Sequence, residues 1–186
     1  MIAPVDVTDV QLVTERLVLR GWSESDLRDL YEYASVEGVG ENAGWDHHRS
    51  LEESRRILES FIQHKKTFAI QLKGSGKVIG SVGLEARDED AGLNEDLRGR
   101  EIGYVLSKDY WGRGLMTEAV TAVIRYCFQE LNFDYLTCGH FDYNDRSRRV
   151  VEKCGFHFLK NVITNTARGV DEPGKLYVLY HSERKR

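Results

Sequence analysis

The chain has 186 residues, of which 41% are hydrophobic and 30% are charged, and its formal net charge is -4. This length suits one domain spanning residues 1–186 with a sizeable core. The mildly acidic balance argues against a nucleic-acid partner, and no apolar run approaches the ~20 residues that span a membrane. The amino-terminal segment has neither a basic start nor a sustained apolar stretch, so we expect no signal peptide and a cytoplasmic protein.

Strand and helix patterns fill the first half of the chain. Ser23, with Asp26 three residues later, resembles a capping box at the start of a first helix. Ser50 is the N-cap expected for a second helix. The predicted elements are a half-buried strand over 11–22, helices over 23–35 and 50–65, and a β-hairpin over 67–86.

The second half alternates strands with two more helices. Gly155 is a natural C-cap for the last of these helices. The predicted elements are a strand over 101–107, a mostly buried helix over 115–132, a strand over 135–141, a helix over 144–155, and two final strands over 156–164 and 175–182. This order, β-α-α-β-β-β-α-β-α-β-β, predicts one α/β domain with a mixed sheet.

The cysteines and histidines show no metal-binding pattern. Cys127, Cys138 and Cys154 are widely spaced and no C-x-x-C pair occurs, so we expect inert, largely buried thiols. His47 and His48 are adjacent, and side chains of neighbouring residues rarely converge on one ion. We therefore expect no bound metal.

The stretch YWGRGLMTEA, residues 110–119, places two glycines before a long predicted helix. The first N–H groups of a helix have no helical partner and carry the positive end of its dipole. Gly112 and Gly114 would let a ligand approach this backbone closely, so the turn is a candidate phosphate site. An ordinary tight connection is the alternative. The turn lacks the Walker A pattern, and Thr117 stands where a dinucleotide fingerprint has its third glycine.

Two longer stretches resemble one protein family. EIGYVLSKDYWGRGLMTEAV, residues 101–120, and NDRSRRVVEKCGF, residues 144–156, resemble the GNAT superfamily of N-acetyltransferases. The likeness is greatest to the branch that contains the bacterial ribosomal-protein N-acetyltransferases of the Rim type, and it extends to residues 12–31 and 43–54. It implies a single GNAT-like domain with a mixed, mostly antiparallel seven-stranded sheet, splayed central strands and about four flanking helices.

The resemblance implies acetyl-CoA as the acetyl donor. The family's phosphate motif reads Gln/Arg-x-x-Gly-x-Gly/Ala, with Trp111 here in the first place, as is common in the Rim-like branch, and Met116 in the last. Backbone N–H groups from Arg113 to Thr117 would then hold the CoA pyrophosphate. The candidate cofactor-binding residues are Val105, Trp111, Gly112, Arg113, Gly114, Leu115, Met116, Thr117, Asn144 and Ser147.

In this family, the strand before the phosphate motif separates from its neighbour, and the pantetheine arm of CoA lies in the gap. Gly103 is the candidate position for a β-bulge that opens the gap, with an ordinary strand glycine as the alternative. By resemblance, the N–H of Val105 is the candidate donor that polarises the thioester carbonyl and stabilises its developing negative charge.

The candidate catalytic base is Glu101, which begins the splayed strand, where some family members carry a catalytic glutamate. Partial burial would raise its carboxyl pKa toward the useful range. A solvated carboxylate at a strand end is the alternative.

The family's usual tyrosine acid is missing, because Val151 stands in its place. By resemblance to the Rim-like branch, Ser147 protonates the leaving thiolate, and a weak donor suffices for a thiol with a reference pKa of ~8.5. A local hydrogen bond at the helix start is the alternative role. Asn144 is the expected N-cap and, by resemblance, contacts the coenzyme or a bound water.

Two further groups are candidates for binding. Trp45 and His48 lie in a loop that would cover the acceptor end, so they are the candidate substrate-binding residues. Four basic residues lie in the helix over 144–155, clustered near its start. They are either a solvated charged face or include a residue that binds the CoA 3′-phosphate. They are Arg146, Arg148, Arg149 and Lys153.

The implied activity is direct transfer of an acetyl group from acetyl-CoA to a primary amine in a ternary complex. We expect the N-terminal α-amine of a protein, such as a ribosomal protein, because its pKa of ~7.7–8.0 leaves more neutral amine than a lysine with ~10.4. The alternatives are a small amine, such as a polyamine, amino acid or antibiotic, and a non-catalytic acyl-CoA-binding module. We expect no nucleic acid or membrane partner, and the sequence leaves a homodimer open.

Overall fold

The computed structural model describes residues 4–86, 92–94 and 96–181. Residues 1–3 belong to the amino-terminal segment in which we expect no signal peptide, and they lie outside the described residues. The strands are β1 (Gln11–Val13), β2 (Leu17–Arg20), β3 (Thr67–Leu72), β4 (Val78–Glu85), β5 (Gly99–Leu106), β6 (Tyr135–Phe141), β7 (His157–Asn165) and β8 (Asp171–Tyr180). The helices are α1 (Leu27–Ala34), α2 (Leu51–His64), α3 (Leu115–Gln129) and α4 (Asp145–Lys153). None of the helices in this part of the chain combines the length and the apolar character needed to cross a membrane.

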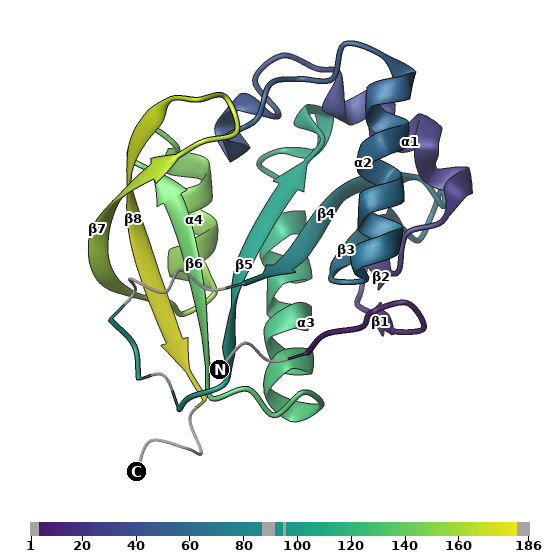
Figure 1. Ribbon diagram of the computed structural model, residues 1–186. Helices are drawn as coiled ribbons and strands as arrows, with labels where there is room; N and C mark the ends of the chain where they lie inside the picture. Colours follow the sequence, from purple (N-terminus) through teal and green to yellow (C-terminus); the bar gives the residue numbers. More distant parts are fainter. Residues whose placement is uncertain (1–3, 87–91, 95, 182–186) are drawn as a thin grey trace.

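The strands form one sheet in the order β1-β2-β3-β4-β5-β6-β8-β7, with helices on both faces (Figure 1). Only the pair β5–β6 is parallel among these described strands. The predicted mixed, mostly antiparallel α/β architecture with four helices is therefore confirmed, with eight strands rather than seven.

The extra strand arises because the predicted strand over 11–22 divides into β1 and β2. The backbone of Thr14 bonds to Leu17, which closes a tight turn. The carboxylate of Glu118, in the first turn of α3, accepts from the Thr14 hydroxyl at 2.6 Å and the Arg16 N–H at 2.8 Å. The alternating pattern alone could not show this turn, because its anchor lies about a hundred residues away in the chain.

Side chains from both faces of the sheet form the core. One cluster packs α3 and α4 against the sheet, and the other packs α1 and α2. Cys127 and Cys138 belong to the first cluster and are 0% and 1% exposed, as predicted. Burial raises the thiol pKa of both residues well above its ordinary value.

The two central strands separate part-way along their length. Parallel pairing of β5 with β6 runs from Gly99–Tyr135 to Ile102–Cys138, after which β5 continues beside β4 and β6 beside β8. This confirms the predicted splay. The register between β4 and β5 has no shift, so the prediction of a β-bulge at Gly103 is wrong. Here β6 leaves β5 without an extra residue in either strand.

Candidate active site

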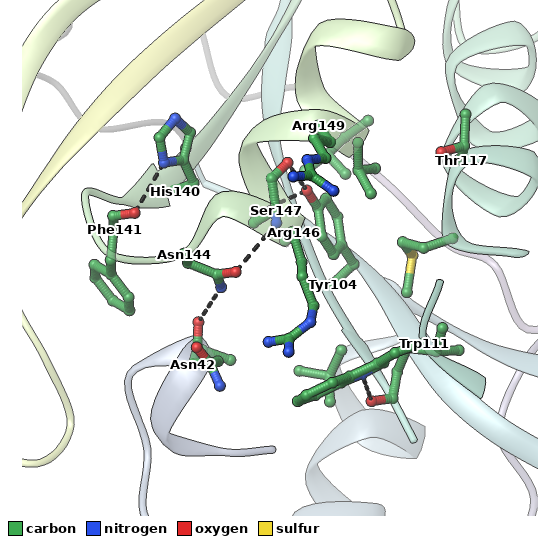
Figure 2. Close-up of a pocket in the computed structure, with 18 of the residues that line it drawn as sticks. Asn42, Tyr104, Trp111, Thr117, His140, Phe141, Asn144, Arg146, Ser147 and Arg149 are labelled. Atoms are coloured by element: carbon green, nitrogen blue, oxygen red, sulfur yellow. Dashed lines mark hydrogen bonds between the residues drawn. The ribbon is translucent and has the colours of Figure 1, made fainter. Parts of the chain in front are cut away.

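A cleft of about 850 Å³ opens where β5 and β6 separate (Figure 2). Its walls come from β5, the turn before α3, the start of α4, the hairpin of β7 and β8, and the loop between α1 and α2. The predicted residues that line it are Glu101, Val105, Trp111, Gly112, Gly114, Leu115, Met116, Thr117, Asn144 and Ser147.

The glycine turn forms the floor at the start of α3. Gly112 and Gly114 both have φ of +75°, a left-handed conformation that favours glycine. The N–H of Glu118 makes the first helical bond to the carbonyl of Gly114, so the three preceding N–H groups of α3 have no partner within the helix. A Cβ placed on Gly112 would have no neighbour within 4 Å, so the cleft is open beside this backbone.

Arg113 is the one predicted phosphate-motif residue that does not line the cleft in the described structure. Its guanidinium lies 5.3 Å from the ring centroid of Tyr110, and its carbonyl accepts from the Arg16 side chain at 3.0 Å. Its backbone remains inside the turn, but its charge lies outside the cleft.

The backbone of Val105 points away from the gap. Ser107 N–H donates to the Ile79 carbonyl on β4 at 2.7 Å, and alternate residues of a strand direct their N–H groups to the same edge. Val105, two residues before Ser107 and paired with Ser81, therefore directs its N–H to β4. This corrects the prediction that the Val105 N–H polarises the thioester.

The opposite edge of β5 faces the gap. The Leu106 carbonyl accepts from the Trp111 indole N–H at 2.8 Å on this side. By the same alternation the N–H of Tyr104 faces the gap, just beyond the last pair with β6. Tyr104 is therefore the backbone donor that the geometry offers to a group lying between the strands.

Glu101 lies at the end of the cleft where β5 is still paired with β6. Its side chain lines the cleft, and a Cβ built on Gly139 of β6 would lie 3.8 Å from its Oε1 atom. Because side chains alternate along β5, Glu101 and Tyr104 are on opposite faces of the sheet. A group held in the gap could thus meet a carboxylate from one face and a hydroxyl from the other.

The start of α4 brings three polar groups together (Figure 2). Asn144 caps the helix, since its side-chain oxygen accepts from the Ser147 N–H at 3.1 Å, as predicted. Its amide N–H donates to the Asn42 carbonyl at 3.1 Å. The hydroxyl of Ser147 lies 2.8 Å from the hydroxyl of Tyr104, so it bonds to β5 rather than to its own helix.

The basic residues of α4 divide into two groups. Arg146, Arg149 and Lys153 line the cleft, with the Arg146 guanidinium 4.5 Å from the Trp111 ring centroid. Arg148 instead pairs with Asp145 and Glu152 on the outer side of the helix. No carboxylate in the described part of the chain forms an ion pair with the three cleft cations, so an anion could meet all three.

Comparison with known proteins decides the family. A family model described as "Acetyltransferase (GNAT) domain" matches residues 16–157. The chain belongs to the GNAT family of acetyltransferases. It is 33% identical over 161 residues to the "Probable N-acetyltransferase YjcK" of Bacillus subtilis (strain 168), covering 84% of this chain and 79% of that protein.

Solved structures share the GNAT fold. A GNAT-family acetyltransferase from Bacillus anthracis has a TM-score of 0.80 at 21% identity, covering 92% of this chain and 98% of its own. The ribosomal-protein-S5-alanine acetyltransferase of Vibrio fischeri has a TM-score of 0.72 at 22% identity, covering 96% and 100%. The microcin C7 self immunity acetyltransferase MccE, solved with acetyl-CoA and AMP, has a TM-score of 0.71 at 17% identity, covering 90% and 94%. The predicted GNAT family is confirmed, and these likenesses extend to a ribosomal-protein acetyltransferase.

Within this GNAT site, Val151 holds the place of the usual tyrosine acid and is 1% exposed in the core. The tyrosine hydroxyl that meets Ser147 comes instead from Tyr104 on β5. The sequence carries no signal for this role of Tyr104, since a tyrosine in an alternating strand is ordinary. Among the described residues, no group of three or more His, Cys, Asp or Glu side chains is placed to hold a metal ion.

The placement of Trp45 and His48 corrects their predicted role in acceptor binding. Neither residue lines the cleft. His48 is 6% exposed and its Nδ1 atom lies 2.7 Å from the Ser54 hydroxyl of α2, while the Trp45 ring packs 5.1 Å from the His48 ring. The two side chains stabilise the loop without lining the cleft. Asn42 and Ala43 of the same loop line the cleft instead.

We therefore expect His48→Ala to lower the free energy of unfolding by about 2 kcal/mol, because it leaves a small cavity and an unpaired buried hydroxyl on Ser54. The KM for the acceptor should stay within about twofold. Chemical denaturation and steady-state kinetics on the same preparation check this. A large rise in acceptor KM without loss of stability would restore the binding role.

Proposed function

We propose that this GNAT protein transfers the acetyl group of acetyl-CoA to the N-terminal α-amine of a protein, such as a ribosomal protein. The charge of the cleft carries the acceptor assignment. Among the described residues that line the cleft, Glu101 is the one acidic side chain, the Arg and Lys side chains all lie on α4, and His140 of β6 adds an imidazole. A polyamine or aminoglycoside would bring several ammonium groups to a single carboxylate. A peptide N-terminus brings a single α-amine to this carboxylate.

The donor would lie across the glycine turn with its pyrophosphate on the free N–H groups of α3. From there the pantetheine arm would enter the gap between β5 and β6, and its thioester carbonyl would meet the Tyr104 N–H. Arg146, Arg149 and Lys153 form a basic wall on α4, and this basic wall would face the phosphates. This arrangement uses the helix start, the strand edge and the cations for one ligand.

The reaction needs a neutral amine, which attacks the thioester carbon. As the C–N bond forms, Glu101 takes the amine proton directly or through water. The C–S bond then breaks, its electron pair stays on sulfur, and Ser147 donates a proton to the leaving sulfur. Solvent in the cleft returns a proton to the Ser147 oxygen, and Glu101 releases its proton to solvent, so the products are an amide and a thiol.

The basic wall gives a direct prediction for acetyl-CoA. We expect the double variant Arg149→Gln/Lys153→Gln to raise the KM for acetyl-CoA about tenfold at low salt, because two cations near the phosphates are removed. Arg148→Gln on the outer side of α4 is the matched control and should change the KM less than twofold. If the two proteins give the same KM, the phosphates do not lie on this wall.

Thiol release from acetyl-CoA over a panel of acceptors tests the proposed function. The panel contains N-terminal peptides of ribosomal proteins, polyamines, amino acids and aminoglycosides. We expect release with peptides whose α-amine is free and none once that amine is blocked. Release with a small amine alone would replace the acceptor assignment, and tight acetyl-CoA binding without release for any amine would favour a non-catalytic module.

A further inference from the structure

The hydroxyls of Tyr104 and Ser147 form a pair at the inner wall of the cleft (Figure 2). The two hydroxyl oxygens are 2.8 Å apart, and the Tyr104 hydroxyl can also donate to the Ser147 carbonyl at 3.2 Å, the longer of its two contacts with Ser147. Both residues line the cleft. The pair joins β5 to α4 at the point where β5 has left β6.

We propose that Tyr104 is a positioning residue for acetyl transfer. Its hydroxyl acts by donating a hydrogen bond to the hydroxyl oxygen of Ser147. The inference rests on the proposed function. It adds Tyr104, which acts through Ser147, to the residues that assist the departure of the sulfur. Tyr104 itself need not touch the substrate through its side chain.

The donor order in the pair matters. In an isolated pair, either hydroxyl can donate to the other, and a serine that donates to tyrosine has its proton turned away from the cleft. Donation by Tyr104 frees the Ser147 proton to point at the sulfur. A hydroxyl that accepts one hydrogen bond also becomes a stronger donor in the next, because the bonds polarise each other.

Burial keeps Tyr104 in the form this role needs. Desolvation, with the neighbouring Cys138 thiol as a further cause, holds the Tyr104 pKa well above its ordinary value. The hydroxyl is therefore protonated before the reaction and can act as a hydrogen-bond donor. The proton given to sulfur comes from Ser147, whose oxygen is stabilised by Tyr104 until solvent returns a proton.

The helix side of the pair is also fixed. The Ser147 N–H donates to the Asn144 cap, so the serine backbone is held at the first turn of α4. Val151, one turn later, brings no hydroxyl. In this chain the tyrosine thus comes from a strand and acts through the serine.

A double-mutant cycle tests this coupling. We expect Tyr104→Phe to lower kcat about tenfold with an unchanged KM for acetyl-CoA, and Ser147→Ala to lower kcat about a hundredfold. The combined variant should match Ser147→Ala within about twofold, because Tyr104 acts through the serine. Tyr177→Phe is the matched control, since that hydroxyl meets His140 Nε2 at 3.3 Å outside the pair. A further tenfold loss in the combined variant would overturn the inference.

A second measurement needs no acceptor. The thiol pKa of bound CoA is titrated by the ultraviolet absorbance of its thiolate. We expect a value below the free ~8.5 in the wild type, an upward shift in Tyr104→Phe, and no further shift when that change is added to Ser147→Ala. Bound CoA with the same thiol pKa in wild type and Tyr104→Phe would overturn this inference alone. Failure to bind CoA at all would overturn the proposed function with it.

Discussion

Gly114→Val should weaken acetyl-CoA binding at least about a hundredfold, which corresponds to about 2.7 kcal/mol. Gly114 has φ of +75° and is the N-cap residue of α3. A β-branched side chain there strains the left-handed backbone and stands over the N–H groups proposed to hold the pyrophosphate. Isothermal titration of the purified variant with acetyl-CoA measures the loss.

The strain itself needs a control, because a left-handed residue other than glycine costs about 1–2 kcal/mol in the fold. Gly76 in the β3–β4 turn offers a close match. Its φ is +72°, and a Cβ there would lie 3.7 Å from a side-chain nitrogen, the same distance as at Gly114. Gly76→Val should lose similar stability and keep full affinity. Equal affinity in the two folded variants would show that the pyrophosphate lies elsewhere.

Glu101→Gln should lower kcat about a hundredfold at pH 7, since it removes the proposed base and the one acidic side chain among the described cleft residues. The KM for acetyl-CoA should stay unchanged, because the carboxylate lies at the acceptor end. Glu85→Gln is the matched control. Glu85 pairs with Glu101 across the β4–β5 ladder but does not line the cleft.

The defect of Glu101→Gln should depend on pH in a stated direction. An α-amine with a pKa of ~7.7–8.0 is mostly protonated below that range and mostly neutral above it. The variant's kcat should therefore rise about six- to tenfold between pH 7 and pH 9 and then level off, so the hundredfold defect narrows to about tenfold. With a lysine acceptor, whose pKa is ~10.4, the kcat would instead keep rising about tenfold per pH unit, without levelling off in this range. A defect that stays constant from pH 6 to 9 would mean that Glu101 does not serve as a base.

Local patterns were enough for most of the fold. The caps at Ser50 and Asn144, the hairpin over 67–86 and the two closing strands all depend on residues within a few positions of each other. The division of the first strand was missed, because its turn is anchored by Glu118 on a distant helix. Strand number thus failed where a long-range contact decides it.

The candidate site could be predicted from the sequence where its backbone conformation requires glycine. Gly112 and Gly114 have the left-handed backbone expected of the turn, and the cleft opens beside it. Residues whose role depends on direction were harder to assign. The edge to which Val105 turns its N–H follows from pairing with β4, and the Tyr104–Ser147 contact joins residues 43 positions apart. Neither relation has a local signal in the sequence.

The most direct test of the account is the position of the acetyl group on a single peptide that carries both a free α-amine and an internal lysine. The peptide is incubated with the protein and acetyl-CoA, and fragmentation by mass spectrometry locates the added mass. We predict one acetyl group on the α-amine and none on the lysine. Acetylation of the lysine alone, or an unmodified peptide beside an acetylated polyamine in the same mixture, would contradict the account.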